Sequence, residues 1–184
     1  MFRSKTIPGC CFAIFAIVVF SCADIKKKVL PSFPVNIPDV NLTVPPIVFV
    51  SDKEIPVGAL KTRINMDSAI KANTAGTFGA AAVSSVKVKR ITIKLLNGNA
   101  ANNLSNFEHV RMRIYSNNDT ASADIADITF PRTYSDSFTV APANSAEISN
   151  FLKGSELGYN LFWRNRRTTT KFLKLKVSLT LSVQ

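Results

Sequence analysis

The C-terminal part of the chain alternates regularly between hydrophobic and polar positions. Over 173–183, single polar residues separate six hydrophobic ones: Leu173, Leu175, Val177, Leu179, Leu181 and Val183. Successive side chains of a strand point to opposite faces, so this period of two predicts a strand with one buried and one solvated face. Such a strand is typical of an antiparallel sheet.

Shorter segments with the same alternation precede it. Strands are predicted over 60–70, 86–96, 107–115, 125–130, 134–140 and 157–163. In the second of these, the hydrophobic phase shifts between Val88 and Ile91, which predicts a bulge near Lys89–Arg90. Segments 71–85 and 97–106 lack this pattern and are expected to be loops. The pattern predicts an all-β fold, a two-sheet antiparallel sandwich of Ig-like or Greek-key type with about seven to eight strands.

One short helix is expected near 145–153. Asn144 can cap its first turn, and Glu147 lies three residues further on, as in a capping box. Gly154 then provides a stop signal.

Proline dominates the segment before the strands. Five of the nine prolines fall between Pro31 and Pro46, and proline excludes helix and central strand because it fixes φ and lacks a donor. We therefore expect 22–46 to be an extended tether whose end becomes an edge strand near Asn41–Val50. A disordered spacer is the alternative. The sandwich domain is assigned to 47–184.

Few residues suggest catalysis. The single histidine, His109, is in phase with the polar face of its strand, whereas general-base catalysis requires an oriented imidazole. The sequence has no nucleophile elbow, zinc-binding His pair or phosphate-binding glycine loop. Asn117–Asp119 with Asp124 resembles a polar turn more than a calcium loop. We expect no enzymatic activity, no cofactor and no metal.

Positive charge is the more informative feature. The chain after residue 21 keeps 21 of the 23 basic residues and all twelve acidic ones, a net charge of +9. A basic hairpin tip is expected to form a patch for an anionic ligand such as an acidic glycan or lipopolysaccharide. Its members are Trp163, Arg164, Arg166, Arg167 and Lys171. The alternative is that these cations only keep the sheet soluble and discourage edge pairing.

The N-terminus has the layout of a secretory signal peptide. Arg3 and Lys5 precede an unbroken apolar run, Cys10–Phe20, which ends in Ser21 and Cys22. A small residue directly before a cysteine resembles the lipobox of bacterial lipoproteins. In that family a signal peptidase cuts before the cysteine, which carries three acyl chains. The resemblance implies that residues 1–21 are a signal peptide and that Cys22 is the lipidated first residue.

Two alternatives remain for this segment. An uncut membrane helix needs about 20 apolar residues, more than Cys10–Phe20 supplies, although the positive flank Lys26–Lys28 fits one. A plain secretory signal needs no cysteine at its cut site. Cleavage before Cys22 leaves one of the three cysteines, and lipidation would occupy it. No disulfide is then expected.

These expectations combine into a membrane-anchored bacterial lipoprotein. Its non-catalytic β-sandwich would bind an envelope component, a glycan or a partner protein. The alternative is a structural subunit of an envelope or fimbrial assembly. The residue after Cys22 is Ala23, not the aspartate that sometimes signals inner-membrane retention, which favours the outer membrane. In that compartment nucleic acid is not an expected partner. Thr120, within Asp119-Thr120-Ala121, matches a short O-glycosylation sequence of exported proteins in some Bacteroidota.

Overall fold

The computed structural model describes residues 30–116, 121–142, 146–152 and 156–184. It contains one α-helix, α1 (Met66–Asn73), and three 3₁₀ turns, η1 (Ala80–Ala82), η2 (Leu104–Asn106) and η3 (Ser149–Leu152). The strands are β1 (Phe33–Val44), β2 (Ser51–Arg63), β3 (Val86–Leu95), β4 (Phe107–Ser116), β5 (Ser122–Thr129), β6 (Ser137–Val140), β7 (Glu156–Asn165) and β8 (Leu173–Val183).

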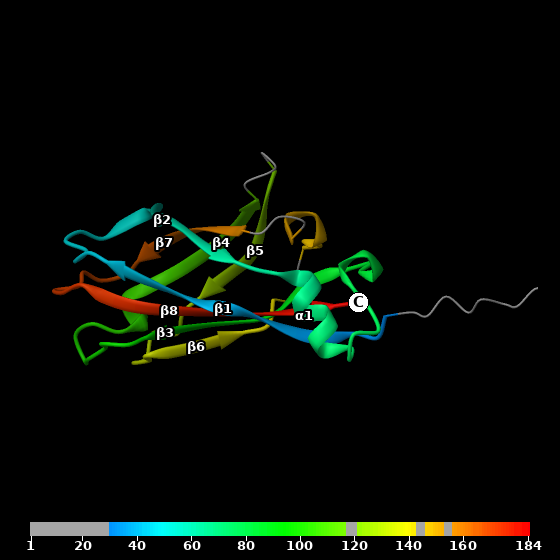
Figure 1. Ribbon diagram of the computed structural model, residues 1–184. Coiled ribbons are helices and arrows are strands. Elements are labelled where there is room, and N and C mark those ends of the chain that lie inside the picture. Colours follow the sequence, from blue (N-terminus) through cyan, green and yellow to red (C-terminus); the bar gives the residue numbers. More distant parts are fainter. Residues whose placement is uncertain (1–29, 117–120, 143–145, 153–155) are drawn as a thin grey trace, which may run out of the picture.

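The strands form two antiparallel sheets packed face to face (Figure 1). One sheet has the order β1-β8-β3-β6 and the other β2-β7-β4-β5. The predicted β-sandwich is confirmed. Its connections are those of a jelly roll, a sandwich built from Greek keys. In an Ig-type sandwich the first two strands pair within one sheet, whereas β1 and β2 lie in different sheets.

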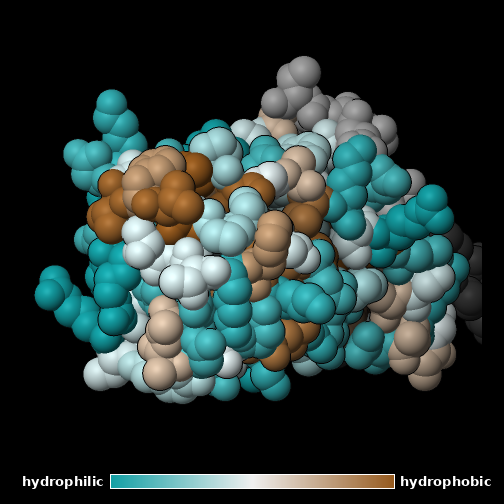
Figure 2. All heavy atoms as spheres, turned by 90° about the vertical axis from the view of Figure 1, so that its left-hand side faces the viewer, coloured by the Kyte–Doolittle hydropathy of each residue, from teal (hydrophilic) through white to brown (hydrophobic). Residues whose placement is uncertain are grey.

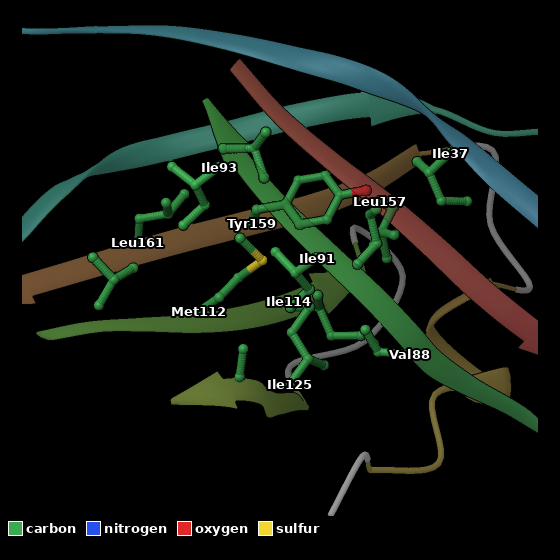
Figure 3. Close-up of a cluster of buried hydrophobic side chains, with 14 of the residues drawn as sticks. Ile37, Val88, Ile91, Ile93, Met112, Ile114, Ile125, Leu157, Tyr159 and Leu161 are labelled. Carbon is green, nitrogen blue, oxygen red and sulfur yellow. The ribbon is translucent and has the colours of Figure 1, made fainter. Parts of the chain in front are cut away.

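The core lies between the sheets, where alternate residues of each strand meet. In β8 all six hydrophobic positions are buried, as the period of two predicts. Figure 3 shows side chains of both sheets directed at one another, among them Ile91 and Ile93 from β3 and Met112 and Ile114 from β4. The predicted bulge in β3 is confirmed by a register shift between Val88 and Arg90.

The Pro-rich segment is part of the sandwich from residue 33 onward, which corrects its assignment as a tether up to residue 46. β1 pairs along its length with β8, from Phe33 opposite Val183 to Val44 opposite Leu173. The prolines are compatible with this strand because it lies at the edge of its sheet. Its alternate apolar residues also supply part of the core.

The helix of the structure lies where a strand is predicted. β2 ends at Arg63, and α1 follows at Met66–Asn73. The Asn65 side chain caps α1 by accepting from the Ser68 N–H at 2.9 Å. Met66 and Ile70 are both buried. Residues four apart share a helix face and also share a strand face, so this short apolar pattern does not distinguish the two.

Of the helix predicted near 145–153, the described residues 146–152 contain only a short 3₁₀ turn and no α-helix. The backbone of Glu147 forms an isolated antiparallel β-bridge with Lys87 of β3. Its carboxylate accepts from the Val86 N–H at 2.8 Å and from the Ser149 N–H at 3.0 Å. Only the 3₁₀ turn η3 follows. The glutamate that suggested a capping box therefore fastens this segment to β3.

The connections divide between the two ends of the sandwich. Leu30, the C-terminus and α1 lie at one end, here called the proximal end (Figure 1). Antiparallel pairing places the loops 45–50, 96–106, 130–136 and 166–172 at the opposite end. We call this the distal end.

Candidate functional site

Trp163, predicted in an exposed ligand patch, is buried. Its residue is 4% exposed, and its ring lies 4.6 Å from that of Phe107 between centroids. The phase of β7 accounts for this, because Leu161 and Trp163 occupy the same buried face. The tryptophan therefore supports the distal end from inside and offers very little surface to a ligand.

The arginines of the predicted patch are largely engaged within the protein. Arg164 forms an ion pair with Glu108 (Nε–Oε2 3.2 Å). Arg166 donates from Nη2 to the Phe130 carbonyl oxygen at 2.8 Å, and Arg167 donates from Nη2 to the Ser105 hydroxyl oxygen at 2.5 Å. Lys171 is partly exposed on the segment 166–172. This segment connects β7 in one sheet to β8 in the other, so the predicted hairpin tip is wrong. The five residues thus lie close together along β7 and the loop after it, but the three arginines contact β4 and the neighbouring distal loops.

Buried asparagine side chains fix the distal loops to one another. Asn102 accepts from the Thr170 N–H at 2.7 Å, and Asn106 donates to the Thr168 carbonyl oxygen at 2.8 Å. Asn165 donates to the Phe49 carbonyl oxygen at 2.9 Å. The sequence suggested only a polar turn over 97–106. An asparagine in a turn and one that bridges two loops look alike in sequence.

The distal end also carries exposed hydrophobic side chains that the sequence analysis missed. Within the described ranges, every exposed large hydrophobic residue lies on its four loops, with exposed fractions from 51% to 78%. We call this group the apolar tip; it consists of Val48, Phe49, Val50, Leu96, Tyr134 and Phe172. Figure 2, which faces this end, shows a hydrophobic area bordered by hydrophilic residues.

An open groove of about 220 Å³ lies beside the loop between β1 and β2. Its walls include Val44, Phe49, Val57 and Trp163, and none of its lining residues is polar or charged. The groove thus adds accessible hydrophobic surface next to the most exposed part of the apolar tip.

Cations accompany these apolar side chains. The four distal loops hold four basic residues and one acidic one, a net charge of +3. Of these, Arg132 is exposed and Lys171 is partly exposed, and Lys174, near the start of β8, is exposed beside them. Across 30–116, 121–142, 146–152 and 156–184, no carboxylate forms an ion pair with any of these three. Their charges are therefore available to an anionic partner.

The outer face of the sheet β2-β7-β4-β5 carries a second charged cluster, which is internally paired. Arg111 of β4 forms ion pairs with Glu54 of β2 (2.5 Å) and Asp124 of β5 (3.2 Å). Its guanidinium lies 4.4 Å from the ring centroid of Phe162 in β7. Arg113 pairs with Asp124 at 2.7 Å. The cluster therefore connects all four strands of the sheet.

Electrostatics in this cluster favour the charged forms. Hydrogen bonding from Arg111 lowers the pKa of Glu54, and the hydrogen bond from Arg113 is the largest cause that lowers the pKa of Asp124. The same contacts raise the pKa of Arg111 and of Arg113. Such mutual shifts are typical of a structural ion-pair network.

His109 belongs to the edge of this network. Its Nε2 contacts Asp127, and its Nδ1 lies 3.5 Å from Glu54. Both ring nitrogens face carboxylates, so neither is directed at a hydroxyl or thiol that it could activate. Within the part of the chain that the structure describes, no group of three or more His, Cys, Asp or Glu side chains is arranged to hold a metal ion.

Several residues from the sequence analysis lie outside the described residues. These are the signal peptide 1–21, Cys22, the turn residues Asn117–Asp119 and the candidate glycosylation residue Thr120. None of the helices described is long and apolar enough to cross a membrane.

Comparisons with known proteins leave the function open. No protein-family model matches the chain, and no curated protein matches it. A solved structure titled "Crystal structure of decameric BFDV Capsid Protein" aligns with 84% of this chain and 99% of that chain, with a TM-score of 0.33 and 8% sequence identity. A likeness of this strength supports no conclusion about function.

Proposed function

We propose that this protein is a lipid-anchored, non-catalytic binding module of a bacterial cell envelope. The resemblance of residues 19–22 to a lipobox supports an anchor at Cys22. The observation that carries the binding role is the division between the two ends of the sandwich. The described part of the chain begins at the proximal end, whereas every exposed large hydrophobic residue of the described ranges lies at the distal end.

This arrangement suits a module that is held at one end and binds at the other. The eight residues from Cys22 to Leu30 span at most about 28 Å, which keeps the proximal end near a lipid at Cys22. β8, with eleven residues, extends roughly 36 Å along the sandwich. The distal loops therefore lie beyond the body of the domain, where a partner can reach them.

The anchor is tested by the intact mass of protein extracted from membranes, with Cys22→Ala as the comparison. We expect a mass equal to residues 22–184 plus three acyl chains, and an unprocessed precursor for the variant. A mass equal to residues 1–184 would replace the lipid anchor with an uncut membrane helix. A mass equal to the processed chain without lipid would indicate plain secretion.

A further inference from the structure

We propose that the distal end binds the surface of an anionic phospholipid membrane, with the apolar tip entering the lipid interface and the neighbouring cations contacting the headgroups. This inference rests on the proposed function and names the partner of the distal loops. Four observations carry it: the location of the exposed side chains, their rigid support, the charge around them and their protrusion.

The location is the first observation. Single exposed hydrophobic residues are normally scattered over a protein surface, whereas gathered ones mark an interaction site. Here they come from four loops that are far apart in the sequence, and the fold brings all of them to one end. Chance exposure of a single loose loop does not produce this pattern.

Rigid support is the second observation. Phe49 and Phe172 are 59% and 60% exposed. The backbone carbonyl of Phe49 accepts from Asn165 Nδ2 at 2.9 Å, and that of Phe172 accepts from Asn97 Nδ2 at 2.8 Å. Each loop is therefore held by a hydrogen bond while its ring faces outward. Because the backbone of these loops is already fixed, less conformational entropy is lost when their side chains bind a partner.

Charge and protrusion favour a lipid surface over a protein. Arg132, Lys171 and Lys174 have no carboxylate partner within the described ranges, and basic residues next to apolar ones are the combination that binds anionic membranes. Val48 and Phe49 protrude from the loop, with 78% and 59% of their surface exposed. A fluid interface accommodates such protrusions, whereas a protein partner needs a cavity of matching shape.

With Cys22 anchored in one membrane, this distal end would hold a second lipid surface, and capture of vesicles tests that directly. The protein is expressed from the full-length sequence, purified in its processed form with any attached lipid, and reconstituted into immobilised phosphatidylcholine vesicles. Free fluorescent vesicles are then added, made either of phosphatidylcholine alone or of equal parts phosphatidylcholine and phosphatidylglycerol. We expect about tenfold greater capture of the anionic vesicles, reduced by high salt.

Two matched variants locate the interaction. The double variant Phe49→Ser/Phe172→Ser is expected to lower capture about tenfold, because it removes two rings that enter the lipid. The triple variant Arg132→Gln/Lys171→Gln/Lys174→Gln is expected to abolish the preference for anionic vesicles. The control Lys87→Gln/Lys89→Gln/Arg90→Gln removes the same charge from exposed residues of β3 and is expected to capture like the unmodified protein.

The outcomes separate this inference from the proposed function. Absence of capture by lipidated, vesicle-bound protein would overturn the membrane proposal and favour a protein or glycan as the partner, with the anchor intact. Equal losses in the distal and β3 triple variants would also overturn it, because net charge alone would then explain binding. Failure of the protein to enter neutral vesicles would refute the anchor, and flotation with anionic vesicles would then test the distal end by itself.

Discussion

The outer face of the sheet β2-β7-β4-β5 and the distal end are both solvated and both charged, yet they differ in how their side chains are partnered. On the sheet face, Arg111 and Arg113 are paired with Glu54 and Asp124 on other strands of the same sheet. At the distal end, hydrophobic rings and cations remain exposed. Charge alone therefore does not identify a binding surface; groups without partners inside the fold do.

Truncation of Trp163 is expected to have the largest effect on stability. Trp163→Ala removes a buried ring that packs against Phe107, and such substitutions lower the free energy of unfolding by about 3–5 kcal/mol. Urea unfolding followed by circular dichroism measures the loss. A decrease below about 1 kcal/mol would mean that the tryptophan is not part of the core and would return it to the candidate ligand contacts.

Arg166 tests the same distinction among the cations of the distal end. Arg166→Ala removes donors to the carbonyl oxygens of Phe130 and Pro131, so we expect the free energy of unfolding to fall by about 1–2 kcal/mol. Arg132→Ala is the matched control at the same end and is expected to change it by less than about 0.5 kcal/mol. Similar changes in the free energy of unfolding for the two variants would contradict the distinction between cations that hold the fold together and cations that are available to a partner.

The strand pattern was predictable from sequence to the extent that burial alternates. β8 and the bulge in β3 follow directly from their hydrophobic phase. Trp163 shares the phase of Leu161, so the alternation indicated burial, and only its proximity to Arg164–Arg167 suggested a ligand patch. The segment Met66–Ile70 was ambiguous because its apolar spacing fits both a strand and a helix.

The apolar tip was not predictable by the same reasoning. Val48-Phe49-Val50 is a continuous hydrophobic run after two prolines, and in sequence it resembles the end of an edge strand. Its exposure depends on where the loop between β1 and β2 meets Asn165 and Thr169. Those contacts join residues more than 115 positions apart, and local patterns contain no information about them.

Acid is expected to weaken the sheet-face network. The folded-state pKa of Asp124 lies below its ordinary value of 3.8, so its ionised form stabilises the folded protein. That contribution is fully present above the unfolded-state pKa and is lost as the pH falls through the folded-state pKa. Unfolding by urea at a series of acidic pH values measures the decline.

Two variants assign this decline to the network. Asp124→Asn and Arg113→Gln each remove one side of the closest ion pair of Asp124, so both are expected to make stability fall less steeply with acid than in the unmodified protein. A steepness unchanged in both variants would show that other carboxyl groups dominate. The network would then contribute less to the free energy of unfolding than its distances suggest.

Phe49→Ser is expected to change stability least and to distinguish the two regions most clearly. The ring is 59% exposed and the Asn165 contact involves only the backbone carbonyl, so the free energy of unfolding should change by less than about 0.5 kcal/mol. Thermal and urea unfolding check this, with Phe107→Ser as a buried comparison expected to be severely destabilised. A large loss for Phe49→Ser would mean that the ring stabilises the fold. A small change would show that the exposed ring contributes little to the fold. That result is expected of a side chain whose role is to contact a partner.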